Sequence, residues 1–83
     1  SAARADVGDE DVFRSVVKSA FSMRRKTLIN CLKSAEFAKQ VDCGVLLEEC
    51  AIDGRRRGET LSLEEFASLS RRVTESIREA SVL

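Results

Sequence analysis

The segment that decides the fold is SLEEFASLSRRVTESI, residues 62–77. Ser62, followed three positions later by Glu65, matches a capping box, in which each side chain accepts a hydrogen bond from the other residue's backbone N–H at a helix start. Leu61, just before this box, is placed to pack against Phe66 as a hydrophobic staple. An apolar stripe at helical spacing continues to about residue 80 and predicts one long helix. The stripe consists of Leu63, Phe66, Ala67, Ser70, Val73 and Ile77.

Two further helices are predicted in the N-terminal half. Asp9 or Asp11 is positioned to cap a first helix, and Ser22 is a candidate cap for a second helix over residues 23–33. Both segments carry apolar residues at helical spacing. The first stripe consists of Phe13, Val16, Val17, Ala20 and Phe21, and the second of Leu28, Ile29, Cys31 and Leu32.

A short helix is predicted from Val45, whereas residues 34–44 show no regular pattern. Its apolar residues are Leu46, Leu47, Cys50 and Ala51. Gly54 suits the left-handed position that commonly follows a helix end. Since no run of residues alternates convincingly at period two, the predicted fold class is all-α, a small bundle of about four helices without a sheet.

Length and composition fit one small domain. The chain has 83 residues, of which 43% are hydrophobic and 34% are charged, and this length is too short for a second domain. We interpret residues 1–10 as a linker or an expression remnant and residues 11–83 as the helical domain. No stretch approaches the roughly 18 apolar residues of a membrane span, and no signal peptide is recognisable. We therefore expect a soluble, cytoplasmic monomer with no membrane contact.

The residue types do not support catalysis or metal binding by this chain. The four glycines form no phosphate-binding motif, and the sequence has no His, Tyr, Trp or Pro. Its three cysteines have spacings that fit no zinc site, and we interpret them as reduced, packed thiols. We predict no catalytic residue, no metal site and no cofactor within these residues.

Positive charge is concentrated in two segments, although 14 basic residues balance 14 acidic ones overall. The span from Arg14 to Lys33 contains six cations and no acid, and Arg55 begins a basic loop. On composition alone, such residues fit a solvated face as well as a phosphate-binding face. Because no aromatic residue is interleaved with them, contact with the RNA backbone and duplex shape is expected rather than base stacking. The predicted RNA-binding residues are Arg24, Arg25, Lys26, Asn30, Lys33, Arg55, Arg56 and Arg57.

Arg25 is expected to have a structural role as well. On a helix over residues 23–33 it points close to the direction of Leu32, toward the core. A buried guanidinium without a carboxylate is costly, so we predict a structural ion pair between Arg25 and either Glu59 or Glu65. Replacing Arg25 with alanine should then destabilise the fold, whereas Lys26→Ala should weaken RNA binding and leave Tm nearly unchanged.

A family resemblance covers roughly residues 11–73. Its motifs are Phe13 with Val16-Val17-Lys18, Ala20-Phe21-Ser22, Arg24-Arg25-Lys26-Thr27-Leu28, Asn30, Leu32, Leu46-Leu47-Glu48, Ile52-Asp53, Arg57-Gly58-Glu59-Thr60-Leu61-Ser62 and Glu65-Phe66. These segments resemble the C-terminal helical domain of bacterial ribosomal RNA adenine dimethyltransferases, which methylate two neighbouring adenines of small-subunit ribosomal RNA. The resemblance places Arg24, Arg25, Lys26 and Arg57 at basic motif positions of that family and Glu59 at its acidic position.

The resemblance implies an accessory role in ribosome biogenesis. In that family, the helical module follows a Rossmann-like catalytic domain that binds S-adenosylmethionine, and it helps that domain to grip small-subunit ribosomal RNA. The chain is thus expected to be an excised C-terminal domain that is not an enzyme by itself. Its implied partners are the ribosomal RNA and the N-terminal catalytic domain of the same protein. The departures are small, with Met23 where Gln is common and Gly54 where Pro often follows Asp.

Two other classes of function stay open. A helix-turn-helix DNA-binding module would use the second and third helices, although the third carries Glu48 and Glu49 and no base-reading Arg, Asn or Gln. A helical protein-interaction domain would instead present the basic face to an acidic partner. Salt-dependent binding to structured RNA, with indifference to duplex DNA, would favour the first interpretation over both.

Overall fold

A computed structural model describes residues 8–82, with side chains up to residue 80. Four α-helices are present in this range, and two short 3₁₀ helices lie between them. The elements are α1 (Glu10–Ala20), α2 (Leu28–Lys33), η1 (Glu36–Lys39), α3 (Cys43–Glu49), η2 (Gly58–Thr60) and α4 (Leu63–Val82). No strand occurs in residues 8–82, and the prediction of an all-α bundle is confirmed. Residues 1–7 of the predicted linker lie outside the described residues.

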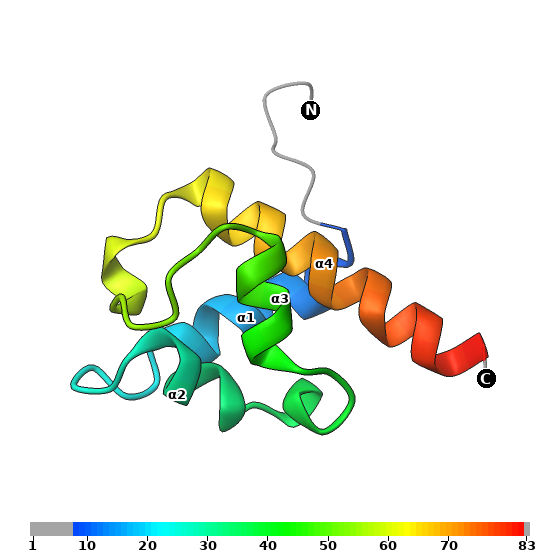
Figure 1. Cartoon of the computed structure of the whole chain (residues 1–83), viewed down its shortest axis with the longest axis horizontal. Helices are drawn as coiled ribbons and strands as arrows, with labels where there is room; N and C mark the ends of the chain where they lie inside the picture. Colours follow the sequence, from blue (N-terminus) through cyan, green and yellow to red (C-terminus); the bar gives the residue numbers. More distant parts are fainter. Residues whose placement is uncertain (1–7, 83) are drawn as a thin grey trace.

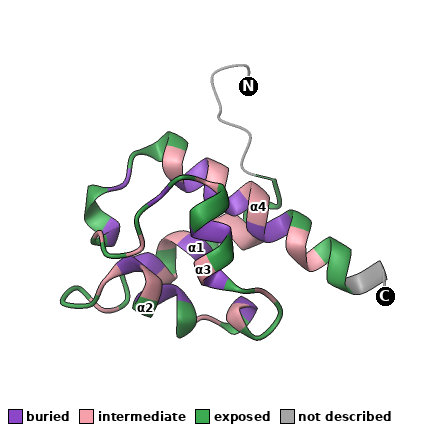
Figure 2. Cartoon of the chain, viewed as in Figure 1, coloured by how far each residue is buried: buried purple, intermediate pink, exposed green. Residues whose placement is uncertain are grey.

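The long helix α4 and the first helix α1 pack together, and α2 and α3 complete the bundle (Figure 1). All four helices contribute buried residues to the core, and the last turns of α4 extend past the other helices (Figure 2). The fully buried residues include Val16, Leu28, Leu69 and Val73. In the described range, no helix combines the length and the apolar character that a membrane span requires.

The predicted start of α4 is confirmed in atomic detail. The Ser62 N–H donates to Glu65 Oε1 at 2.9 Å, and the Glu65 N–H donates to Ser62 Oγ at 3.1 Å. Leu61 and Phe66 are both buried in the core, as expected of a hydrophobic staple. Leu63 is an exception to the predicted stripe, because it is 63% exposed. At the first position of the helix, Leu63 lies before α4 enters the core, and Leu61 fills the apolar position instead.

Helix α1 begins where the sequence predicted. Asp9 is the N-cap, and its Oδ1 accepts hydrogen bonds from the backbone N–H groups of Asp11 at 2.8 Å and Val12 at 3.2 Å. Val16 and Ala20 are buried. Phe21, predicted to belong to the same stripe, is 47% exposed, because it is the C-cap residue and lies at the rim of the bundle.

Helix α2 begins five residues later than predicted, at Leu28 rather than at residue 23. Ser22 does not cap it, since the Ser22 hydroxyl donates to the Ser19 carbonyl at 2.7 Å and ends α1. The first backbone N–H groups of α2 are satisfied by a distant segment. Leu28 N–H donates to the Arg56 carbonyl at 2.6 Å, and Ile29 N–H donates to the Gly54 carbonyl at 3.0 Å. This tertiary capping fixes the helix start and is invisible in the local sequence.

Helix α3 ends in a Schellman motif, but the left-handed residue is not the predicted Gly54. It is Ala51, at φ 57°. The Ile52 N–H donates to the Leu47 carbonyl at 2.9 Å and the Ala51 N–H to the Glu48 carbonyl at 3.0 Å, which are the two hydrogen bonds of that motif. Burial of Ile52 offsets the cost of a left-handed alanine. Gly54 instead lies close to α2, where a Cβ would be 3.0 Å from Ile29 Cβ.

Candidate nucleic-acid interface

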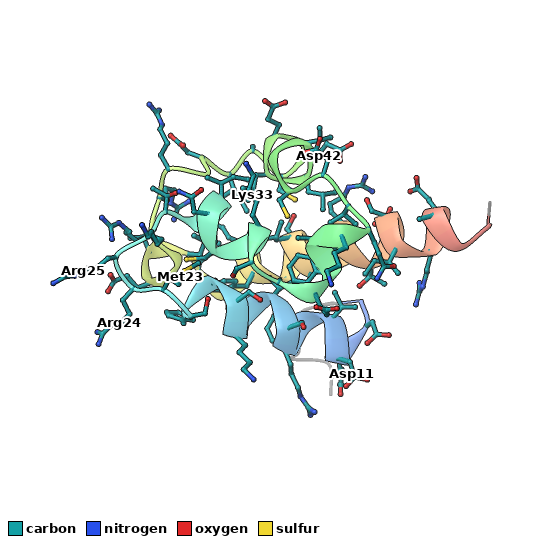
Figure 3. The ribbon with its side chains drawn as sticks, turned by 90° about the horizontal axis from the view of Figure 1, so that it is seen from below. Asp11, Met23, Arg24, Arg25, Lys33 and Asp42 are labelled. Carbon is teal, nitrogen blue, oxygen red and sulfur yellow. The ribbon has the colours of Figure 1, made fainter. Side chains whose placement is uncertain are left out.

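Three consecutive exposed cations lie on the cationic turn, residues 23–27, which joins α1 to α2. The Lys26 N–H donates to the Met23 carbonyl at 3.0 Å, so the chain reverses here instead of forming a helix. Arg24, Arg25 and Lys26 are exposed, and Figure 3 shows Arg24 and Arg25 projecting away from the helices. Within residues 8–80, none of these three side chains pairs with a carboxylate.

Two donors from other parts of the chain hold the cationic turn in place. Arg57 Nη1 donates to the Arg24 carbonyl at 2.9 Å. The thiol of Cys31, which is completely buried in α2, donates to the Met23 carbonyl at 3.3 Å. The turn is thereby ordered before any ligand arrives, which lowers the entropy cost of binding.

The basic loop, residues 53–57, presents its charge differently. The Arg55 side chain donates two hydrogen bonds to Asp53, from Nε to Oδ1 at 3.2 Å and from Nη2 to Oδ2 at 3.0 Å. These hydrogen bonds from the Arg55 side chain, together with that from its backbone N–H, lower the pKa of Asp53 to about 2. Arg55 is exposed, but its charge is opposed by the adjacent carboxylate.

Arg56 is a structural residue, and it replaces Arg25 in the predicted ion pair. Arg56 Nη1 and Nη2 contact the two carboxylate oxygens of Glu65 at 2.6 and 3.1 Å, and Nη2 also donates to the Thr60 carbonyl at 2.6 Å. The Arg56 hydrogen bonds, with help from the Ser62 N–H, lower the pKa of Glu65 to about 2. The predicted pairing of Arg25 with Glu59 or Glu65 is wrong, because residue 25 lies in a turn, where the helical projection used to aim it does not apply.

The cationic turn and the basic loop meet at the start of α2. The carbonyls of Gly54 and Arg56 accept the first N–H groups of α2, directly after the turn. Close by, buried Gly58 packs so tightly on the end of α1 that a Cβ would lie 2.9 Å from the Ala20 carbonyl carbon and collide with its oxygen. Segments some thirty residues apart in sequence thus form one cationic edge of the molecule.

The two predicted binding residues on α2 differ in their position relative to that edge. Asn30 Nδ2 donates to Thr27 Oγ1 at 3.1 Å. Lys33 is exposed at the far end of α2, beside Asp42 and Cys43. Figure 3 shows Lys33 near Asp42 and away from Arg24 and Arg25. Burial is the main cause that raises the pKa of the Cys43 thiol, with Asp42 adding to it and Lys33 opposing it.

The structure therefore sorts the eight predicted RNA-binding residues into groups. It brings Arg24, Arg25, Lys26 and Arg57 together at one edge, whereas carboxylates oppose the charges of Arg55 and Arg56. Asn30 bonds to Thr27 of the cationic turn, and Lys33 lies at the far end of α2. RNA binding by any of them stays a prediction. The sequence reasoning missed the positioning role of Cys31, and no signal in the sequence indicates it.

No cluster of three or more His, Cys, Asp or Glu side chains suitable for a metal ion occurs in the part of the chain that the structure describes. The three cysteines are free thiols. Cys31 and Cys43 are buried, and Cys50 is half-buried.

Comparison with known proteins gives consistent relatives. No model of a protein family matches the chain. The chain is 60% identical over 70 residues to a protein of Geobacter sulfurreducens named ribosomal RNA small subunit methyltransferase A, an alignment that covers 82% of this chain and 25% of the relative. Proteins of the same name from Moorella thermoacetica and Clostridium acetobutylicum are 54% and 49% identical over 65 and 67 residues, covering 78% and 81% of this chain and 22% and 24% of the relatives. The chain spans about a quarter of the length of these curated relatives.

Proposed function

Because the chain is homologous to the C-terminal part of the ribosomal RNA small subunit methyltransferase A family, we propose that it is an accessory domain that binds small-subunit ribosomal RNA. In this proposal, the domain positions an N-terminal catalytic domain, which uses S-adenosylmethionine to methylate adenines. The 83 residues supply contacts and no methyl-transfer chemistry. The family resemblance indicated by the sequence motifs is confirmed by these relatives, whereas the accessory role is our proposal.

The observation that carries the proposal is the cationic turn. Three consecutive exposed cations, Arg24, Arg25 and Lys26, have no carboxylate partner among the described residues, and Arg57 lies beside them. An isolated domain gains no packing from such a group. RNA phosphates are contacted by Arg and Lys through charge and shape, and a turn held by two tertiary hydrogen bonds presents those charges in a fixed arrangement.

Helix geometry disfavours the helix-turn-helix alternative. Helices α2 and α3 have 6 and 7 residues, and α3 exposes Glu48 and Glu49. A recognition helix enters the major groove and contacts base edges there, where paired acidic side chains would repel the phosphate backbone. The cations lie instead on a turn and a loop, which suit a folded RNA surface.

The test compares two variants with equal net charge. Arg24→Ala/Arg25→Ala removes two cations from the turn, and Lys39→Ala/Arg78→Ala removes two exposed cations from η1 and α4. Binding to a structured fragment of small-subunit ribosomal RNA is measured over a range of salt concentrations. Log K falls as log salt rises, and the turn variant should make this fall less steep by about 0.7 to 0.9 for each lost phosphate contact. The control should reduce the steepness by less than half of the value for one contact. Tm should stay within about 2 °C in both variants, because exposed side chains contribute little to stability.

Equal losses in the two variants would contradict a localised RNA-binding edge. Binding to duplex DNA as strong as binding to the RNA would favour the DNA-binding alternative. Absence of any salt-sensitive binding to nucleic acid would favour a protein-interaction domain.

A further inference from the structure

A small pocket opens beside the cationic turn. It has a volume of about 70 Å³ and is partly open to solvent, and it lies between the end of α1, the turn and η2. Its apolar part is formed by Ala20, Phe21, Met23 and Gly58. Arg24, Lys26, Arg57 and Glu59 line the same pocket. The pocket therefore combines an apolar wall with cations and one carboxylate.

Phe21 gives this pocket a partly exposed aromatic wall. One side of its ring rests on the buried Phe66, with ring centroids 5.9 Å apart and planes tilted by 38°. Nevertheless, Phe21 remains 47% exposed, whereas Phe66 is only 7% exposed. A supported but half-exposed aromatic ring beside cations is the arrangement on which proteins stack bases of single-stranded nucleic acid.

The charges of the pocket narrow the ligand class. Arg24, Lys26 and Arg57 attract an anion. A carboxylate on Glu59, in the same pocket, disfavours a bare phosphate but accepts hydrogen bonds from an amino group. A nucleotide offers both partners, because its phosphate is anionic and the edge of cytosine or adenine carries an exocyclic amine.

We propose that this pocket binds one unstacked nucleotide of the RNA, with its base on the ring of Phe21, an exocyclic amine toward Glu59 and its phosphate near Arg24, Lys26 and Arg57. This inference rests on the proposed RNA-binding function and deepens it. It also revises the sequence-based prediction that RNA is contacted through backbone and duplex shape without base stacking, since the fold brings Phe21 to the cationic edge.

The test uses the absence of tryptophan and tyrosine from the chain. In a Phe21→Trp variant, the indole is the sole strongly fluorescent residue, and a base stacked on it quenches its emission. The probes are single-stranded oligocytidylate and a blunt, fully paired RNA duplex of the same length. We expect quenching by oligocytidylate and little quenching by the duplex, whose bases stay within the helix.

A second variant tests the energetic role of the ring. Phe21→Leu should weaken binding of oligocytidylate about five-fold or more, the lower limit for losing one stacked base, and binding of the duplex by less than about two-fold. Because Phe21 also contacts Phe66, Tm is measured in parallel, and the Phe21→Trp variant should retain the affinity that Phe21→Leu loses. Glu59→Ala should reduce the preference for oligocytidylate over oligouridylate, which carries no amine at that position.

The outcomes separate the pocket from the RNA-binding function. Equal quenching of the introduced indole by duplex and single strand would overturn the nucleotide pocket and leave the accessory RNA-binding role intact. The same conclusion would follow if Phe21→Leu bound oligocytidylate as the unchanged protein does. Absence of salt-dependent binding by both RNAs would overturn both proposals. If Phe21→Leu lost as much affinity for the duplex as for oligocytidylate, the ring would stabilise the turn rather than stack on a base.

Discussion

The cationic turn and the basic loop have similar sequences and different chemistry. Each presents three consecutive cations, and each lies at the same edge beside the start of α2. In the loop, Arg55 bonds to Asp53 and Arg56 bonds to Glu65, and Arg57 donates to the Arg24 carbonyl of the turn. In the turn, the side chains bond to no carboxylate in the described range. Arg57 and Cys31 hold its backbone, and Asn30 donates to the Thr27 hydroxyl. Positive charge in the sequence is therefore a poor measure of positive charge available to a ligand.

The difference follows from where each segment finds its hydrogen-bond partners. The loop uses its carbonyls to cap α2, the guanidinium groups of Arg55 and Arg56 to bind itself and α4, and that of Arg57 to hold the turn, so it works as structural support. The turn receives support and gives none through its side chains. This division predicts that changes in the loop alter stability, that changes in the turn alter binding, and that changes at their junction alter both.

The largest effect is expected at the junction. In Gly58→Ala, the new methyl group would collide with the carbonyl of Ala20, and neither backbone is free to retreat without disturbing α1 or η2. Overpacking of this kind costs about 2–3 kcal/mol, or roughly 10–20 °C in Tm for a domain of this size. Thermal unfolding followed by circular dichroism measures the loss.

Gly44→Ala is the matched control. A Cβ on Gly44 would meet only Asp42 Oδ1, at 3.4 Å, and Gly44 lies inside α3, where alanine is the better helix former. Its Tm should be unchanged or slightly higher. If Gly58→Ala were as stable as Gly44→Ala, the close contact between η2 and α1 would not be a constraint on the fold.

Whether the sequence predicts the start of a helix depends on how far along the chain the hydrogen-bond partners of that start lie. The start of α4 is predicted correctly because Ser62 and Glu65 satisfy each other within one turn. The start of α2 is predicted wrongly because its N–H groups bond to Gly54 and Arg56, about 25 residues away in the chain. Local patterns report local partners, and tertiary partners need the fold.

The same limit explains the outcome for the site. The sequence locates the cationic cluster. The predicted inward direction of the Arg25 side chain is wrong, because it assumes a helix at residue 25, whereas α2 begins at Leu28. The pairing of Glu65 with Arg56, and the exposure of Phe21, depend on how η2 and the basic loop return to α1. Neither can be read from the spacing of charges.

A smaller effect is expected on exchanging one cation in each region. Arg56→Met removes the guanidinium that binds Glu65 and the Thr60 carbonyl, and it should lower Tm by roughly 5 °C because charged hydrogen bonds are lost from a half-buried site. Arg25→Met changes the net charge equally at an exposed position of the turn and should change Tm by less than about 1 °C.

RNA binding should show the opposite order. The salt slope should fall by about 0.7 to 0.9 in Arg25→Met, for one lost phosphate contact, and by less in Arg56→Met, whose charge is already opposed by Glu65. The helical projection of the sequence instead implies that Arg25 supports the fold. A large drop in Tm for Arg25→Met, with none for Arg56→Met, would restore that expectation and reverse the roles of turn and loop.

The smallest effect is expected in the pH dependence of stability that arises from Glu65, the carboxylate that binds Arg56 of the loop. The pKa of Glu65 is lowered to about 2 in the folded chain from an ordinary 4.5, so the unfolded chain binds more protons than the folded chain between these values. Stability from this group is therefore present above about pH 5 and is lost as pH falls toward 2. Glu65→Gln cannot titrate, and its Tm should decline less steeply over that range. Glu64→Gln, an exposed neighbour on α4, should follow the unchanged protein. Because the cations of the turn have no carboxylate partner in the described residues, they add no such acid sensitivity. If Tm declined equally with falling pH in Glu65→Gln and in the unchanged protein, the Glu65 carboxylate would not anchor the loop.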